Sequence, residues 1–171
     1  MTKAHWRRVV AGTAVCIGSL AVPFAAPVSA ADHQSLHGTF RETATGATLG
    51  YNISGSAKLT IEINASTAKV NVAGLDLTKM YGSHLHNGPC SSGGGGHYQN
   101  SAGGLTTPPN ELWLSSTAAA NGPLVPNKGG VAHGNGTSAW AARIDSATLT
   151  NARSIVVHEP GGARIACADL T

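Results

Sequence analysis

Polar and apolar side chains alternate along Lys58-Leu59-Thr60-Ile61-Glu62-Ile63 and again, after a short turn, along Thr67-Ala68-Lys69-Val70-Asn71-Val72. Such alternation is typical of a β-strand with one face in a core and the other in water, because successive side chains point to opposite faces. Since only a short turn separates the two runs, we expect them to pair as an antiparallel hairpin.

Similar short runs predict further strands at 36–41, 49–53, 80–86, 138–144, 154–158 and 163–168. Turn signals separate many of these runs, namely Asn87-Gly88, Asn121-Gly122, Asn135-Gly136 and Pro160-Gly161-Gly162. No long stretch has the periodicity of a helix. Together these features predict an all-β domain, built as an antiparallel sandwich or barrel.

The first thirty residues have the features of a secretory signal peptide. Lys3, Arg7 and Arg8 form a basic start, an apolar run follows to about residue 24, and Val28-Ser29-Ala30 supplies small residues for cleavage before Ala31. The pair Arg7-Arg8 leaves a twin-arginine signal open as an alternative. We therefore expect a signal peptide at 1–30, one domain at 31–171 and a secreted protein. No later segment is long and apolar enough to span a membrane.

The charge of the chain is balanced once the signal peptide is removed. The full chain has a formal net charge of +3, but three of its 11 basic residues precede residue 31, which leaves equal numbers of basic and acidic residues. No basic run remains that would favour nucleic acid as a partner.

Two of the three cysteines, Cys90 and Cys167, lie in the predicted mature domain. An even pair in an exported protein is typical of a disulfide. The glycine- and proline-rich stretch 89–130 begins beside Cys90, and a loop of this length is usually either functional or disordered. A flexible linker stays open, but Cys90 and His97 favour an ordered loop that is tethered by the disulfide.

Seven of the eight histidines follow the signal peptide. His84 and His86 stand two positions apart on a predicted strand, so their rings share one face and can converge on one point. Imidazole suits copper, zinc, iron and nickel, and a tetragonal set of four nitrogens favours Cu²⁺. An ordinary surface or core histidine remains the alternative for each. Alternation along strands does not bring His97 and His158 to the same point.

Five motifs, in order along the chain, resemble copper–zinc superoxide dismutases. They are the approach Ala73-Gly74-Leu75 to Tyr81, the copper half-site Gly82-Ser83-His84-Leu85-His86 with Cys90, Gly96-His97-Tyr98, Ser154-Ile155-Val156-Val157-His158-Glu159, and Gly162-Ala163-Arg164-Ile165-Ala166-Cys167. The resemblance covers most of the mature domain and is poor between residues 99 and 140. It implies a Greek-key β-sandwich or barrel.

The resemblance also implies a role for each matching residue. The copper ligands would be His84, His86, His97 and His158. His97 matches the residue that bridges copper and zinc and that carries a proton when it leaves copper. Arg164 matches the arginine that attracts and orients the superoxide anion. Cys90 and Cys167 match the disulfide that ties the loop to the barrel.

The chain departs from that family in two places. The usual zinc site needs two more histidines and an aspartate, yet residues 98–132 contain neither, and His133 is expected to lie elsewhere. Only five residues separate His158 from Arg164, where the family has a longer charged loop. Both departures resemble the copper-only branch, so we expect copper without zinc and a copper site that is open to solvent.

Without zinc, another group must hold the far nitrogen of His97, since histidines bound to metal usually donate their other N–H to a carboxylate or carbonyl. Glu111 is the one acid between Asp76 and Asp145 and a candidate for this position. A plain solvated carboxylate is the alternative.

The function expected from the motifs is a secreted, copper-dependent superoxide dismutase whose partner is the superoxide anion. A non-enzymatic extracellular protein that buffers or carries copper is the alternative, and it would need the histidines but not Arg164. A metal-free adhesion or structural domain would need neither. No role is predicted for His33, His37 or His133, and no oligomeric state.

Overall fold

The hairpin predicted between residues 58 and 72 is present in the computed structural model. Strands β2 (Ser54–Glu62) and β3 (Ala65–Ala73) pair antiparallel, with Lys58 opposite Lys69. Leu59 is buried and its neighbour Lys58 is exposed, as the alternation of side chains requires. The structure describes residues 33–117, 119, 122–144 and 151–171, so the predicted signal peptide lies outside the described residues.

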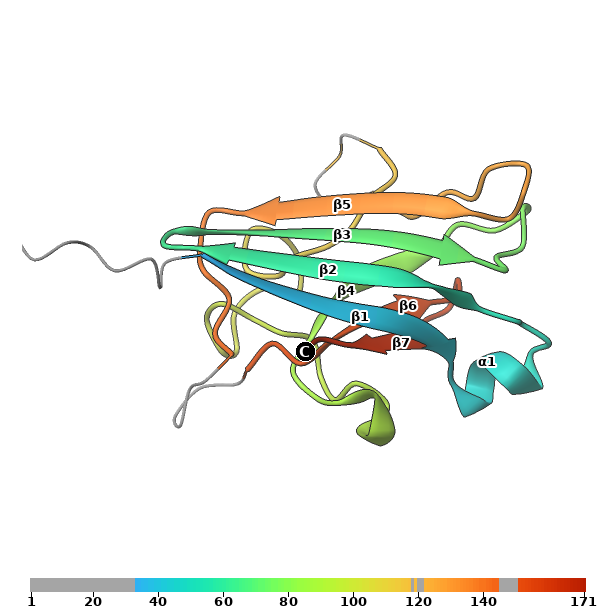
Figure 1. Cartoon of the computed structure of the whole chain (residues 1–171), viewed down its shortest axis with the longest axis horizontal. Helices are drawn as coiled ribbons and strands as arrows, with labels where there is room; N and C mark the ends of the chain where they lie inside the picture. The colour runs from blue at the N-terminus through green and yellow to red at the C-terminus, as the bar shows by residue number, and fades with distance from the viewer. Residues whose placement is uncertain (1–32, 118, 120–121, 145–150) are drawn as a thin grey trace, which may run out of the picture.

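Seven strands form one curled antiparallel sheet in the order β4-β6-β7-β1-β2-β3-β5 (Figure 1). The other five strands are β1 (Gln34–Glu42), β4 (Gly82–His86), β5 (Ala132–Ser138), β6 (Ser154–His158) and β7 (Arg164–Asp169). After β3, the chain places β4 at one end of the sheet, β5 at the other and β6 back beside β4, so these connections cross over as in Greek-key folds. The predicted all-β fold is confirmed.

A short segment bridges the two free edges of the curled sheet. On one side it bonds to β4, where Leu114 N donates to Ser83 O at 2.8 Å and Leu85 N donates to Leu112 O at 3.1 Å. On the other side it bonds to β5, where Ser115 and Asn135 exchange backbone hydrogen bonds of 2.9 and 3.0 Å. We call residues 111–115 the closing segment.

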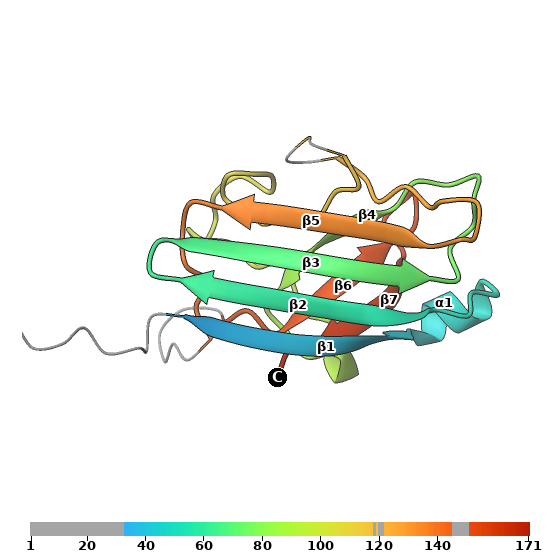
Figure 2. The same ribbon diagram turned by 45° about the horizontal axis from the view of Figure 1, so that its top comes forward.

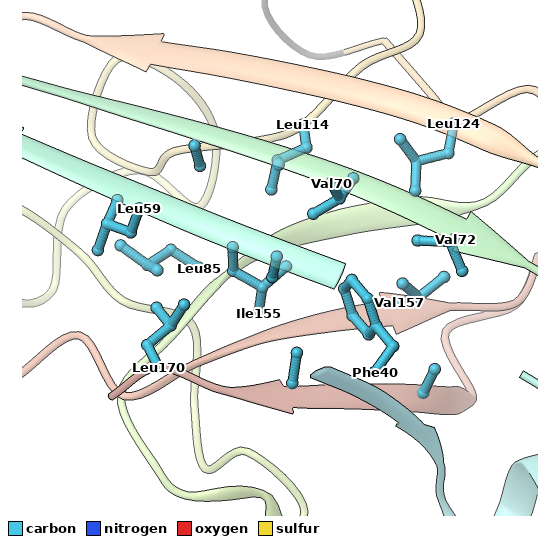
Figure 3. Packing of buried hydrophobic residues seen from close by; sticks show 14 of the residues in the cluster. Phe40, Leu59, Val70, Val72, Leu85, Leu114, Leu124, Ile155, Val157 and Leu170 are labelled. Carbon is cyan, nitrogen blue, oxygen red and sulfur yellow. The ribbon is translucent and has the colours of Figure 1, made fainter. Parts of the chain in front are cut away.

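The core lies between the two parts of the curled sheet. Strands β6 and β7 cross obliquely behind β1, β2 and β3 (Figure 2), and the side chains between them interdigitate (Figure 3). The fully buried apolar residues include Leu59, Val72, Leu85, Leu114 and Ile155. Burial of each such side chain stabilises the fold by about 1.5–3 kcal/mol relative to exposure.

Two predicted strands are wrong. Residues 49–53 form no strand, because the short helix α1 (Ala44–Thr48) precedes them. Thr43 caps this helix by accepting a hydrogen bond from Gly46 N at 3.0 Å, and a capped turn satisfies backbone groups without a strand partner.

The strand predicted at 138–144 lies earlier, at β5, and ends where the predicted one begins. Its inward positions include Gly134 and Gly136, so its core face carries little apolar side chain and shows no hydrophobic pattern. The glycine at 136 is required by packing, since a Cβ there would lie 2.0 Å from the Trp113 carbonyl oxygen of the closing segment.

Within the described residues, none of the helices has the length and apolar character needed to cross a membrane.

Candidate metal centre

Strand β4 presents two histidines on one face, as the sequence predicts. Leu85 points into the core and is fully buried, while His84 and His86 lie on the opposite face with their rings stacked 4.8 Å apart. Strand β6 pairs with β4 so that His158 lies opposite Gly82. Three of the four predicted ligands therefore come from two hydrogen-bonded strands.

The fourth histidine arrives on a loop that folds back over β4. Asn87 N donates to Gly96 O at 3.0 Å and Tyr98 N donates to Leu85 O at 2.8 Å, which places His97 opposite His86. The glycine-rich part of this loop passes close to the strands: Gly94 has φ +87°, and a Cβ there would lie 2.6 Å from a methyl group of Val156. Only glycine permits this approach.

Four histidines, His84, His86, His97 and His158, offer ring nitrogens that all lie within 4.8 Å of one another. The Nε2 atoms of His86 and His158 are 3.2 Å apart. Such a set of imidazoles could hold a metal ion, and it is compatible with copper. Alternation predicted the convergence of His84 and His86, whereas the inclusion of His97 and His158 was implied by the family resemblance alone.

Hydrogen bonds at the outer nitrogens fix the proton position on two of these rings. His97 Nδ1 lies 2.9 Å from Glu111 Oε2, and His158 Nδ1 lies 3.0 Å from Gly162 O. Carboxylate and carbonyl oxygens only accept, so each ring donates from Nδ1. In the neutral ring this leaves a lone pair on Nε2, which is the form that binds a metal.

The hydrogen bonding of His84 gives an independent indication of whether these residues could bind a metal ion. Its Nδ1 atom is buried and has no hydrogen-bond partner among the described residues. A buried polar atom without a partner is costly and usually has a functional explanation. Coordination of a metal by Nδ1 would satisfy this atom, so the residues present fit a bound metal ion and are compatible with copper.

Burial keeps three of the clustered rings neutral. Desolvation is the largest cause of a lowered pKa in each case: it lowers the pKa of His84 far below its usual range, lowers that of His86 to about 3 and lowers that of His158. Charges on neighbouring rings and on Arg164 lower each pKa further. The three rings would therefore not need to lose a proton to bind a metal ion near neutral pH.

Glu111 lies against His97, at the position considered from the sequence. Its side chain is fully buried, whereas the side chain of His97 is 32% exposed. Glu111 Oε2 also accepts from Trp113 Nε1 at 2.8 Å, and Oε1 accepts from Gln99 Nε2 at 3.2 Å. Sequence reasoning missed both donors. Trp113 could have been found from the alternation in 111–115, which puts it on the same face as Glu111 and leaves the leucines to the core.

The predicted disulfide between Cys90 and Cys167 is present and attaches the loop to β7. Arg164 begins β7 and pairs with His158 across the two strands. Its Nη1 atom donates to Gly93 O in the loop at 2.6 Å. Arg164 also lines a groove of about 1070 Å³, which none of the four histidines reaches.

The other described histidines, His33, His37 and His133, are exposed and stand outside the cluster. Neither a scan against models of protein families nor a search of curated proteins found a match to this chain.

Proposed function

We propose that this chain is a secreted, copper-dependent superoxide dismutase of the copper-only type. In the reaction, two superoxide anions and two protons become one dioxygen and one hydrogen peroxide. The observation that carries the proposal is the convergence of four imidazoles, three of which burial keeps neutral, beside an arginine that is in register with one of them. The disulfide is in keeping with an oxidising, extracytoplasmic location.

The ligands would be His84, His86, His97 and His158. Copper, when bound, would supply the redox chemistry by taking an electron from one superoxide and giving it to another. The protein supplies a fixed site for the metal and a charge that attracts the anion. Arg164 would meet the second need, because its guanidinium is always charged and lies close enough to the cluster to lower the pKa of His84, His86 and His158.

His97 is the ring best placed to carry a proton. It is the half-buried member of the cluster, with a side chain that is 32% exposed, whereas His84, His86 and His158 are buried. With Nδ1 donating to Glu111, the proton that moves would be carried at Nε2. Glu111 stays fixed during this exchange because it accepts hydrogen bonds from two further side chains.

Copper without zinc is favoured by the same contact. His97 resembles the histidine that bridges copper and zinc in two-metal enzymes, so its Nδ1 would face the zinc. Here that nitrogen donates to Glu111 instead. A carboxylate in this place holds the ring as a second metal would, which supports a site for one metal.

A copper carrier is the competing function, and Arg164 separates the two. If the arginine steers superoxide, Arg164→Ala should keep its copper affinity and copper spectrum. Its dismutation rate should fall by about tenfold or more and depend less on ionic strength. Arg164→Lys should recover part of the rate, since the charge survives without the planar fork. Stopped-flow decay of superoxide at several salt concentrations measures these effects.

The opposite outcome follows if Arg164 only holds the loop through Gly93. Arg164→Ala would then lower the melting temperature, while the copper-loaded variant kept the rate and salt dependence of the parent protein. That result would favour the carrier.

A further inference from the structure

Trp113 is linked to two of the four histidines, to one by direct contact and to the other through a carboxylate. Its ring lies 5.2 Å from the ring of His84, and its backbone forms a β-bridge with the same residue. Its indole N–H donates to Glu111 Oε2, the oxygen that also accepts from His97 Nδ1. One side chain thus contacts a ligand from strand β4 directly and a ligand from the loop through a single carboxylate.

The hydrogen bonds of that carboxylate determine where His97 can point. An oxygen of a carboxylate accepts in two lone-pair directions, and here Oε2 uses them for His97 and Trp113. Gln99 holds the other oxygen at 3.2 Å, a longer contact than the 2.8 Å from Trp113. Without the indole donor, the Glu111 carboxylate could rotate about χ3, because that torsion has a broad energy minimum. The His97 ring would then rotate with it.

The backbone around Trp113 gives this contact a rigid base. The closing segment is bonded to β4 on one side and to β5 on the other, and Leu112 and Leu114 anchor it in the core. The indole therefore starts from a strand-like backbone fixed at both edges, whereas His97 stands on a loop. A group held on strands can orient one held on a loop.

We propose that Trp113 is a positioning residue of the metal centre, which fixes Glu111 on His97 and packs on His84 so that both ligands are in place before a metal binds. The proposal deepens the proposed function and rests on it for the identity of the metal. It concerns geometry in the metal-free protein, so it can be tested without superoxide.

The test compares Trp113→Phe, which keeps an aromatic ring and removes the donor, with Trp140→Phe. Trp140 is the matched control because it also donates from Nε1, but to Pro109 O rather than to Glu111, and its ring packs on Tyr98. In metal-free protein, nitrogen-15 NMR should find the His97 Nδ1 proton exchanging with water about tenfold faster in Trp113→Phe, as expected when a bond to a charged group is lost. Trp140→Phe should leave that exchange unchanged.

A second readout uses Cu²⁺ alone. Trp113→Phe should bind Cu²⁺ about tenfold more weakly and shift its electron paramagnetic resonance spectrum in the direction seen for Glu111→Gln. Trp140→Phe should keep the parent spectrum, even if it lowers the melting temperature. Unchanged His97 exchange together with an unchanged Cu²⁺ spectrum in Trp113→Phe would overturn the proposal.

Folding of the variant need not limit the test. Trp113→Gln retains an N–H donor and should keep more of the His97 protection than Trp113→Phe. In the parent protein, the indole proton of Trp113 should exchange as slowly as the His97 Nδ1 proton, and exchange of either within the dead time contradicts the proposal. A parent protein that passes these tests but shows no dismutation would contradict the proposed enzymatic function. The positioning role of Trp113 would still hold.

Discussion

His97 and His158 donate their Nδ1 protons to fixed acceptors, whereas His84 has a buried Nδ1 with no partner. Spacing predicted the pair His84 and His86, because alternation along a strand is local. It could not predict the acceptors, since Glu111 meets His97 only through a tertiary contact between a loop and the closing segment. Trp113 was also missed, although the local alternation in 111–115 puts it on the same face as Glu111.

The metal-free protein should lose stability as the pH falls. The folded-state pKa values of His84, His86 and His158 are lowered by burial, so these rings stay neutral in the fold while the unfolded chain takes up protons near pH 6.5. Their contribution is fully present above about pH 6.5 and is lost as the pH falls toward the folded values. At about pH 5.5 each of these rings should lower the free energy of unfolding by up to about 1.4 kcal/mol relative to neutral pH.

Urea unfolding at neutral pH and near pH 5.5 measures this dependence. His86→Asn should make it shallower, because one of the three groups is gone. A free energy of unfolding that does not change over this range would show that the rings are hydrated or already protonated in the fold.

At the scale of the elements, two segments outside the sheet complete the metal centre: the loop at 87–97 and the closing segment at 111–115. The hairpin β2–β3 and the strands β6 and β7 were predictable, because their side chains alternate or form buried apolar runs. The predicted position of strand β5 was wrong, because Gly134 and Gly136 on its inner face give no hydrophobic pattern from which a strand could be predicted. The role of the closing segment could not be predicted from its sequence, because it depends on which strands form the two edges of the sheet.

The disulfide should matter most for the loop that carries His97. Besides Cys90–Cys167, the loop is held by Arg164 at Gly93 O and by Ser154 at Gly88 O, at 2.6 and 2.7 Å. Replacing both cysteines by alanine should lower the free energy of unfolding by about 2–5 kcal/mol, since the bridge spans 77 residues. Its loop amides should exchange faster, while those of β2 and β3 change little in native conditions.

Hydrogen exchange followed by mass spectrometry distinguishes the loop from the hairpin. Reduced parent protein is the control and should behave as the double variant does. Equal protection of the loop with and without the bridge would contradict its role as a tether.

At the scale of the whole molecule, the metal centre lies outside the barrel core. Leu85 points inward and the two histidines beside it point outward, where the loop covers them. The core and the site can therefore vary separately, which explains why an all-β fold was predictable without knowledge of the metal. If the predicted signal peptide is removed, the charge of the remaining chain is balanced, which leaves local charges such as that of Arg164 to attract an anion.

If this histidine cluster binds copper and the bound copper disproportionates superoxide, the rate of superoxide decay should depend on bound copper. The measurement uses exported protein that was offered copper and zinc together and then freed of unbound metal. The decay rate should rise in proportion to copper up to one ion per chain, with no stoichiometric zinc, and His86→Ala should show no such rate. Stoichiometric zinc in a second site, or decay no faster than that of His86→Ala with the same total copper, would show that the cluster is not a copper-only dismutase site.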